Sequence, residues 1–342
     1  MTANLSGLDG CVAASACHAL WAQTMIDNDW ITVSGLTIPN SFGASDTEFA
    51  ATQATIGLCE ISYRSVLQFS GADRRDFLAW ALIMQDGLGE PGTSAEVCWV
   101  DDSGWLRGTG ALFAFSNDRD WLISDVFDLA WFQDGALGFD VEVAALNAPG
   151  ADPALQGLAL CGPENERLLH ALDCPPDGGL WTWQDALCAV RKVSASCCEL
   201  WAPSGIGPAL ATSIFKSGVP FGLQSVGFAA AEAYRVRSLA PRAGVDWIPV
   251  QSISLWEEAR TPAHLGIKVQ EGPFSGQTGL LRRTAPGQIL ALLREGPLAP
   301  SQVRNAPASA LSAYRLAWIP NQGARKGSVY HKFLIEDLLS TD

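Results

Sequence analysis

The sequence has few charged residues, and those it has are mostly acidic. Only 17% of the 342 residues are Asp, Glu, Lys or Arg, and 36 acidic residues face 22 basic ones, a formal net charge of −14. Proteins that bind nucleic acid neutralise its phosphates with basic patches. The acidic balance therefore argues against nucleic acid, and equally against an anionic membrane surface, as a partner.

Patterns typical of metal sites and disulfide frameworks are also missing. The four histidines, His18, His170, His264 and His331, share no metal-ligand spacing. The nine cysteines are odd in number and form no CxxC motif, which indicates neither a disulfide framework nor a zinc site. They are Cys11, Cys17, Cys59, Cys98, Cys161, Cys174, Cys188, Cys197 and Cys198. We expect no metal site and a reducing compartment.

The adjacent pair Cys197 and Cys198 allows two interpretations. The pair could serve a redox or metal role. Alternatively, one cysteine is buried in the core and its neighbour points the other way along a strand, as alternate side chains of a strand do. The second interpretation is favoured.

Long apolar runs are missing as well. No window approaches the 18 consecutive apolar residues of a membrane-spanning helix. The N-terminal residues MTANLSGLDGC lack the basic region and apolar run of a secretory signal. With 48% hydrophobic residues, the chain can nevertheless bury a large core. We expect a cytoplasmic protein of two or three parts.

The order of expected elements indicates an α+β fold with antiparallel sheets. Helices are expected over residues 10–28, 45–56, 163–173, 208–217 and 229–237. Strands are expected over residues 61–70, 95–102, 120–125, 155–161 and 187–201, and around LALLRE and YRLAWI. Asp73 is expected to cap the helix that begins DRRDFL. No GxGxxG follows an expected strand, which argues against a parallel sheet with a phosphate-binding loop.

Five segments resemble, in the right order, the landmarks of the glycine-cleavage T-protein (aminomethyltransferase) superfamily. They are GLCEISYRSVLQFSGADRRDFL (57–78), WVDDSGWLRGTGALF (99–113), CELWAP with SGVPFGLQSVGFAAAEAYRV (198–203 and 217–236), YRVRSLAPRAGVD (234–246) and FSGQTGLL (274–281). No segment is specific alone, but their order covers nearly the whole chain. The resemblance implies a three-part, disc-like fold with a central hole that holds tetrahydrofolate. We expect parts over residues 1–150 and 151–285, and a small C-terminal β-domain over 286–342.

The resemblance also implies candidate binding residues. Arg235 stands at a landmark arginine, and an arginine pairs with carboxylates in a bidentate way, so it could hold the glutamate tail of the folate. Equally, it could be a structural arginine that ties two parts of the fold together. The other candidates, for which core packing is the alternative, are Trp99, Trp105, Arg107, Glu199 and Trp201.

The sequence departs from the family at three places. Gly108 or Thr109 stands where the family has the Asp of aminomethyl transfer. Ala195 stands four residues before Glu199, where a pterin-binding Glu is expected. Pro273 replaces the cysteine of relatives that assist iron–sulfur cluster assembly. These departures argue against aminomethyl transfer and cluster assembly, and no catalytic residue is predicted.

The predicted function is tetrahydrofolate-dependent transfer of a methyl group from a small methylated donor. In such a reaction the protein mainly positions donor and acceptor, and a tryptophan face could hold a cationic donor. Two alternatives stay open. The chain could be a structural or regulatory subunit that has lost folate chemistry, or it could have a remodelled pocket for another small-molecule reaction.

Overall fold

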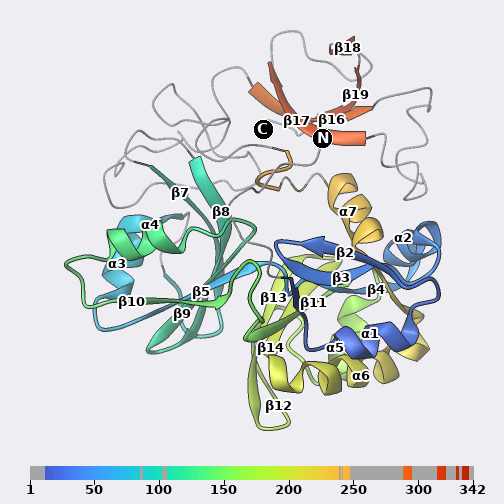
Figure 1. The fold of residues 1–342 in the computed structure, drawn as a ribbon, viewed down its shortest axis with the longest axis horizontal. Coiled ribbons are helices and arrows are strands. Elements are labelled where there is room, and N and C mark those ends of the chain that lie inside the picture. The colour runs from blue at the N-terminus through green and yellow to red at the C-terminus, as the bar shows by residue number, and fades with distance from the viewer. Residues whose placement is uncertain are drawn as a thin grey trace.

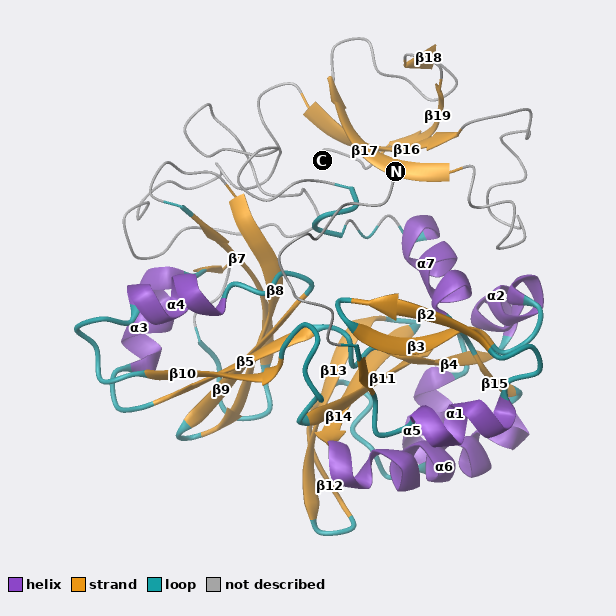
Figure 2. Cartoon of the chain, in the orientation of Figure 1, coloured by secondary structure: helices purple, strands orange, loops and turns teal. Residues whose placement is uncertain are grey.

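The structure is a computed structural model that describes residues 12–84, 88–101, 106–238, 240 and 242–246, and the backbone of four strands between residues 288 and 338. Within this part, helices lie against the faces of the sheets (Figures 1 and 2). Two six-stranded sheets lie side by side, and the C-terminal strands form a sheet of their own above them in this view. The α+β class is confirmed.

The first six-stranded sheet is antiparallel throughout. Its strands, in spatial order, are β10 (Glu142–Asn147), β5 (Ser65–Ser70), β9 (Arg119–Ser124), β8 (Leu106–Ser116), β7 (Ser94–Val100) and β6 (Ile83–Met84). Helices α3 (Arg74–Ala81) and α4 (Leu129–Gly135) pack on one face, where Phe77, Trp99 and Phe132 are fully buried.

The second six-stranded sheet is antiparallel except that β4 and β15 run parallel. Its strands, in spatial order, are β12 (Gly179–Trp183), β13 (Ala186–Ser194), β14 (Cys197–Pro203), β11 (Leu155–Cys161), β4 (Ile56–Glu60) and β15 (Leu223–Ser225). One face packs against helices α1 (His18–Thr24), α5 (Asn165–Ala171) and α6 (Gly207–Gly218).

The other face of the second sheet packs against the first sheet and two helices, α2 (Ser45–Ala54) and α7 (Phe228–Arg237). This central core joins Phe113 and Ile123 of the first sheet to Trp201 of the second and to Phe49 and Ala230 of the two helices. The side chains alternate along the strands, so β14 buries Glu199 and Trp201 toward this core and Leu200 on the opposite face.

The remaining strands form two smaller sheets. The N-terminal sheet has the order β1 (Ala13–Ala14), β3 (Leu36–Ser41) and β2 (Asp29–Val33). The C-terminal sheet has the order β17 (Tyr314–Pro320), β16 (Gln288–Arg294), β19 (Phe333–Leu338) and β18 (Val329–Tyr330). The strands expected around LALLRE and YRLAWI therefore exist. The predicted division of the chain near residues 150 and 285 stays a prediction.

The first sheet is inserted between two neighbouring strands of the second. Strands β4 and β11 pair side by side, yet all of residues 65–147 of the first sheet lie between them in the chain. The amide of Asn147 closes the base of this insertion. Its Nδ2 donates to the carbonyl oxygens of Ser62 (3.1 Å) and Leu155 (3.0 Å), and its Oδ1 accepts from the Leu155 N–H (2.9 Å). One buried side chain thus joins the outgoing chain at Ser62 to the returning chain at Leu155.

A buried glutamate attaches the N-terminal segment to the second sheet. Glu60, at the end of β4, accepts hydrogen bonds from Ser15 Oγ (2.9 Å), Trp21 Nε1 (2.5 Å) and Gln156 Nε2 (2.8 Å). Burial raises the pKa of Glu60, and these bonds from neutral donors offset only part of that rise. The polar contact therefore aligns the segment before α1 without a buried ion pair.

Three expected elements differ from the structure. The helix expected over residues 10–28 is helical only over His18–Thr24, because residues 13–14 pair with β3. The strand expected over residues 61–70 begins only at Ser65, and residues 61–64 form a turn. Asp73 makes no side-chain cap; its Oδ2 instead accepts from the Asp140 N–H at 2.8 Å. The FSGQTGLL segment lies outside the described residues.

No helix in the described part of the chain is long enough to span a membrane. The longest helix of this part, α6, has 12 residues, and no helix there combines the length and hydropathy that crossing a bilayer requires.

Candidate functional site

The turn over residues 61–64 carries the chain from the second sheet to the first and places Arg64 between them. Arg64 Nη1 donates to Glu199 Oε1 on β14 at 2.7 Å. Its Nε donates to Asp125 Oδ1, just after β9, at 3.2 Å. One guanidinium therefore bridges carboxylates from the two sheets.

A second arginine, Arg191 on β13, makes the same kind of bridge. Its Nη1 lies 3.1 Å from Glu199 Oε2, and its Nη2 pairs with Glu96 on β7 of the first sheet. Both oxygens of Glu199 are thus paired with guanidinium groups. We call the alternating series Asp125, Arg64, Glu199, Arg191 and Glu96 the junction network.

The junction network keeps its central charges. Burial pushes the pKa of Glu199 upward, but attraction by Arg64 and Arg191 outweighs it and lowers the pKa below the ordinary value. Burial likewise disfavours the charge on Arg64, but Asp125 and Glu199 outweigh it and raise its pKa. Glu199 is therefore a carboxylate at neutral pH, and both of its neighbours are cations.

The arginine-rich segment YRVRSLAPRAGVD forms a second set of ion pairs, which we call the α7 network. Arg235 Nε donates to both carboxylate oxygens of Glu232 at 3.1 Å, and its Nη1 donates to Asp246 Oδ2 and to the carbonyl oxygen of Ala240, both at 2.6 Å. Arg242 Nη1 donates to Glu232 Oε1 at 2.8 Å. These bonds fold the segment after α7 back onto the helix.

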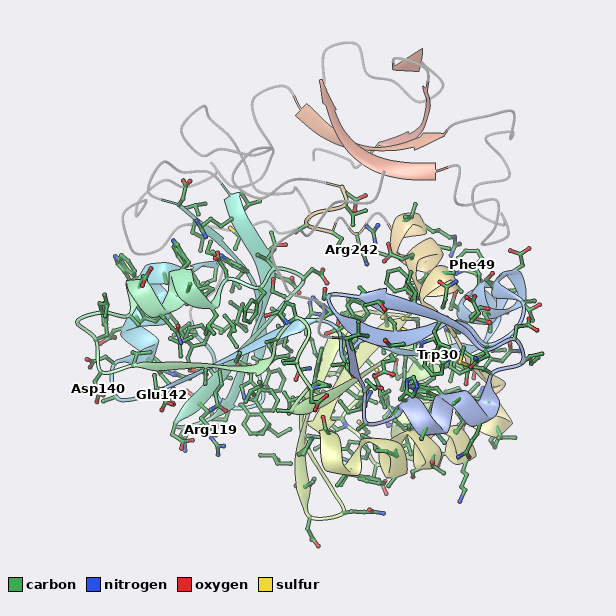
Figure 3. The ribbon with its side chains drawn as sticks, in the orientation of Figure 1. Trp30, Phe49, Arg119, Asp140, Glu142 and Arg242 are labelled. Atoms are coloured by element: carbon green, nitrogen blue, oxygen red, sulfur yellow. The ribbon has the colours of Figure 1, made fainter. Side chains whose placement is uncertain are left out.

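An aromatic pair lies between the two networks. The Tyr63 and Phe228 rings meet edge to face with centroids 5.8 Å apart, and the Arg242 guanidinium lies 5.3 Å from the centroid of the Phe228 ring. Burial, with the nearby carboxylates of Asp125 and Glu232, raises the pKa of Tyr63. Figure 3 shows Arg242 between the groups built on the two six-stranded sheets, beneath the C-terminal sheet. Charged and aromatic side chains from both sheets and α7 therefore gather at one place.

The predicted site residues fall into two groups. Glu199 and Trp201 belong to the junction: Trp201 is fully buried, and its Nε1 lies 3.4 Å from Glu199 Oε2. Trp99 and Arg107 instead meet at Asp128, beside α4. Trp99 is fully buried and donates to Asp128 Oδ2 at 2.9 Å, while Arg107 donates to both Asp128 oxygens at 2.8 and 2.7 Å.

Of the other two predicted residues, only Arg235 is described by the structure. Trp105 lies outside the described residues. Arg235 lies in the last turn of α7, with three of its nitrogens in the α7 network. These contacts are structural, but they join α7 to the segment that follows it and not, as the alternative had it, two parts of the fold.

The expected carboxylate positions hold no carboxylate in the described structure. Ala195 lies in the exposed hairpin turn between β13 and β14. Gly108 is buried against Trp99, and a Cβ atom added there would lie 2.1 Å from Trp99 Cζ2. Thr109 is partly exposed on the other face of β8.

Sequence reasoning missed Arg64 and Arg191 as site residues. Each is a single arginine within a mostly apolar stretch, ISYRSV and CAVRKV, the second of which also holds Lys192. A buried arginine needs a carboxylate partner, so this pattern signals an ion pair. The partner of each comes from an element distant in the chain, and the sequence carries no direct sign of it.

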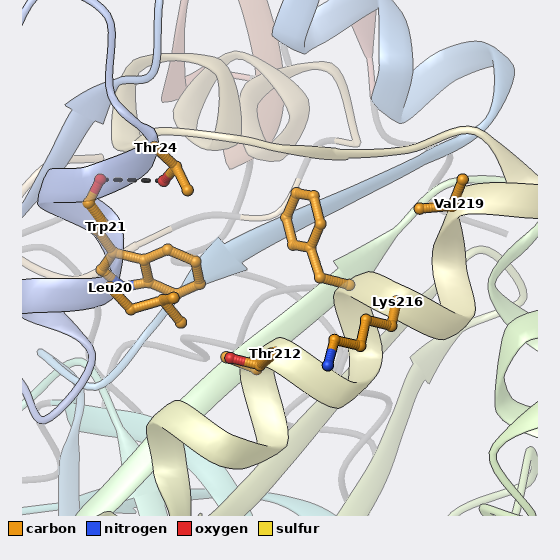
Figure 4. Close-up of a pocket in the computed structure, with 8 residues that line it drawn as sticks. Leu20, Trp21, Thr24, Thr212, Lys216 and Val219 are labelled. Carbon is orange, nitrogen blue, oxygen red and sulfur yellow. Dashed lines mark hydrogen bonds between the residues drawn. The ribbon is translucent and has the colours of Figure 1, made fainter.

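A separate hollow lies between α1 and α6 (Figure 4). It has a volume of about 250 Å³. Its lining residues are Leu20, Trp21, Thr24, Ala211, Thr212, Phe215, Lys216 and Val219. The lining is mostly apolar and includes none of the predicted site residues.

The two arginines of α7 provide a test of their roles. We expect Arg235→Ala to lower the free energy of unfolding by about 2 kcal/mol, because it removes charge-assisted hydrogen bonds to Glu232 and Asp246. Arg237→Ala is the matched control, because the buried Nε of Arg237 makes no hydrogen bond within the described residues. Thermal melts compare the two. A normal melt with lost ligand binding in Arg235→Ala would show a binding arginine instead.

Comparison with known proteins gives sequence relatives named aminomethyltransferase. No protein-family model matches the sequence. Proteins named aminomethyltransferase from Cupriavidus necator and Cupriavidus metallidurans are 26% and 27% identical over 153 and 166 residues, which is 43% and 46% of this chain. These matches cover 40% and 43% of the relatives, so the chain spans less than half the length of the curated relatives it matches.

A solved structure extends the comparison over most of the chain. The crystal structure of glycine cleavage system aminomethyltransferase T from Bartonella henselae aligns with a TM-score of 0.63 at 18% identity, over 84% of this chain and 79% of that one. The fold is therefore the aminomethyltransferase fold. With the sequence relatives, it confirms the predicted resemblance to the glycine-cleavage T-protein superfamily.

Proposed function

We propose that the chain is a tetrahydrofolate-dependent one-carbon transferase with its folate site at the junction of the two six-stranded sheets. The observation that carries the proposal is the junction network. It brings Arg64, Arg191 and Glu199 together within the aminomethyltransferase fold. The relatives named aminomethyltransferase support the transfer of a one-carbon group as the reaction class.

The donor set at the junction suits a reduced folate. A pterin ring has both N–H donors and nitrogen and carbonyl acceptors, and the network offers carboxylate acceptors beside guanidinium donors. Tyr63 and Phe228 add aromatic surface, and Arg242 could pair with a carboxylate of the glutamate tail. When bound, tetrahydrofolate supplies the amine nitrogen that accepts the one-carbon unit.

The chain's own groups would act by positioning. Neither Gly108 nor Thr109 offers a carboxylate to stabilise a cationic centre, so the rate gain would come from holding donor and acceptor close and correctly oriented. Taken together, the junction and α7 networks contain more carboxylates than arginines. The carboxylates are those of Glu96, Asp125, Glu199, Glu232 and Asp246, and the arginines are Arg64, Arg191, Arg235 and Arg242. This balance favours a small methylated cation, such as a sulfonium or quaternary ammonium, as the donor.

One observation favours a second candidate, a subunit without folate chemistry. Both oxygens of Glu199 and the guanidinium of Arg235 already have partners within the chain. A pterin or a glutamate tail would have to share or displace these partners. In this alternative the networks hold the two sheets together and the protein serves a structural or regulatory role.

Folate binding distinguishes the two candidates. We expect 5-formyltetrahydrofolate to quench the tryptophan fluorescence of the purified protein in a saturable way at micromolar concentration, with N-acetyltryptophanamide as the control for light absorption by the ligand. Arg242→Ala should weaken binding by roughly one to two decades, which corresponds to about 1.5–3 kcal/mol. Arg119→Ala, at a largely exposed ion pair with Asp118, is the matched control. Absence of quenching at millimolar ligand would support the second candidate.

A further inference from the structure

Two cysteine side chains meet across neighbouring strands of the second sheet. Cys161 on β11 and Cys197 on β14 are direct partners in the antiparallel register. Their Sγ atoms lie 2.9 Å apart. Thirty-five residues, including α5, β12 and β13, separate them in the chain, so only the fold brings the thiols together.

The backbone around this pair fits a disulfide bond. Directly opposite residues of antiparallel strands have Cα atoms about 4.5–5.5 Å apart. A disulfide joins Cα atoms about 4.4–6.8 Å apart. The two thiols could therefore be linked without a change in strand register.

The other nearby cysteines are placed differently. Cys161 is partly exposed, while its partner Cys197, like Cys59 on β4 and Cys198 on β14, is buried. Cys59 is paired in register with Ala159 rather than with Cys161. Cys198 faces the opposite side of β14 and packs in the core beneath α5 and α6. Only the Cys161–Cys197 pair, among the cysteines in the described residues, has its sulfur atoms in mutual contact.

We propose that Cys161 and Cys197 are a modification site, a dithiol that a small disulfide such as glutathione disulfide converts into a cross-strand disulfide. The thiolate of one cysteine attacks a sulfur of the small disulfide, and one glutathione thiolate leaves. The second cysteine thiolate attacks the mixed disulfide, and the second glutathione thiolate leaves. The pair loses two electrons to the oxidant, and its two protons pass to the released glutathione thiolates.

The pair lies beside the junction network. Cys197, Glu199 and Trp201 alternate along β14 and share the face that packs in the central core. The Cys161–Cys197 bond would fix β11 to β14 two residues from Glu199. The hydrogen bond with Cys197 and, to a smaller extent, burial raise the pKa of the Cys161 thiol. Because the thiolate is the attacking form, disulfide formation should become faster as the pH rises.

Peptide mapping of the whole protein tests this site. The reduced protein is incubated at pH 8 in glutathione buffers of increasing oxidised fraction, and its free thiols are then blocked with iodoacetamide. We expect a linked peptide pair joining Cys161 to Cys197, lighter by two hydrogens than the reduced peptides, in wild type and in Cys198→Ser. The link should be absent in Cys161→Ser and Cys197→Ser.

The wild-type map decides the outcome even if a serine variant folds poorly. Alkylation of both Cys161 and Cys197 in the most oxidising buffer would overturn the proposal. Stable glutathione adducts on either residue, or a bond from Cys59 in place of this one, would overturn it as well. A melting temperature that rises on oxidation in wild type and Cys198→Ser, and does not rise in Cys161→Ser, would support the bond as one within a folded chain.

Discussion

Replacing Glu199 with glutamine is expected to lower the free energy of unfolding by about 3 kcal/mol, because it leaves the buried Arg191 and the mostly buried Arg64 without their shared carboxylate. This value is at the lower end of the loss expected when a buried ion pair is broken, because Arg64 keeps its pair with Asp125 and Arg191 keeps its pair with Glu96. Chemical denaturation at neutral pH measures the difference. Asp118→Asn, at an exposed ion pair with Arg119, is the control and should leave the stability unchanged.

The pH dependence of this difference follows from the pKa of Glu199. The fold lowers that pKa below the value of about 4.3 for an unfolded glutamate. The stabilisation is therefore fully present above about pH 4.3 and is lost as the pH falls through the folded value. Wild type and Glu199→Gln should converge in stability at acidic pH. If the stability difference between wild type and Glu199→Gln stayed constant down to pH 3, the packing of Glu199, and not its charge, would account for that difference.

Gly108→Asp is expected to destabilise the fold by about 3 kcal/mol or more, through overpacking and a buried carboxylate. The new Cβ atom would lie 2.1 Å from Cζ2 of Trp99, a fully buried ring packed against Phe132. The variant should melt early and lose the near-ultraviolet circular dichroism of its ordered tryptophans. We also expect no aminomethyltransferase activity with a carrier protein, because the substitution does not restore the missing pterin contact.

Thr109→Asp is the matched control for this clash. Thr109 is adjacent in the chain, is partly exposed and faces the other side of β8. Its substitution should cost about 1 kcal/mol, the ordinary effect of a point mutation. Equal melting temperatures for the two variants would mean that Trp99 can move aside, and the close packing of Gly108 would then not explain the missing carboxylate.

Much of the fold could be predicted because local patterns specify it. The apolar runs LQGLALC and LCAVRKV, and the helices around FAAAEAYRVR and PALATSIFKS, occur where periodicity predicts them. The prediction was wrong where contacts between distant segments of the chain determine the secondary structure. Residues 13–14 pair with β3 instead of continuing a helix. Residues 61–64 bend into a turn because the flanking strands belong to different sheets.

The site was harder to predict than the fold. Glu199 and Trp201 were predicted as candidates because the CELWAP segment resembles a landmark of the superfamily, and the structure places the two side chains in contact on one face of β14. Arg64 and Arg191 were not, because each meets Glu199 only after separate strands pair. The role of Arg235 stayed open for the same reason, since its partner Asp246 is brought close by the fold of the segment that follows α7.

The insertion closed by Asn147 has a mechanical consequence. The first sheet leaves and rejoins the second through two adjacent chain segments, so the covalent link between the sheets is narrow and their relative orientation rests on the shared core and the ion pairs. Arg64 lies close to this link, two residues after Ser62, while the Arg191–Glu96 pair joins β13 of one sheet to β7 of the other. Separating the two sheets would therefore expose their shared core and break both contacts, although the chain itself would stay connected.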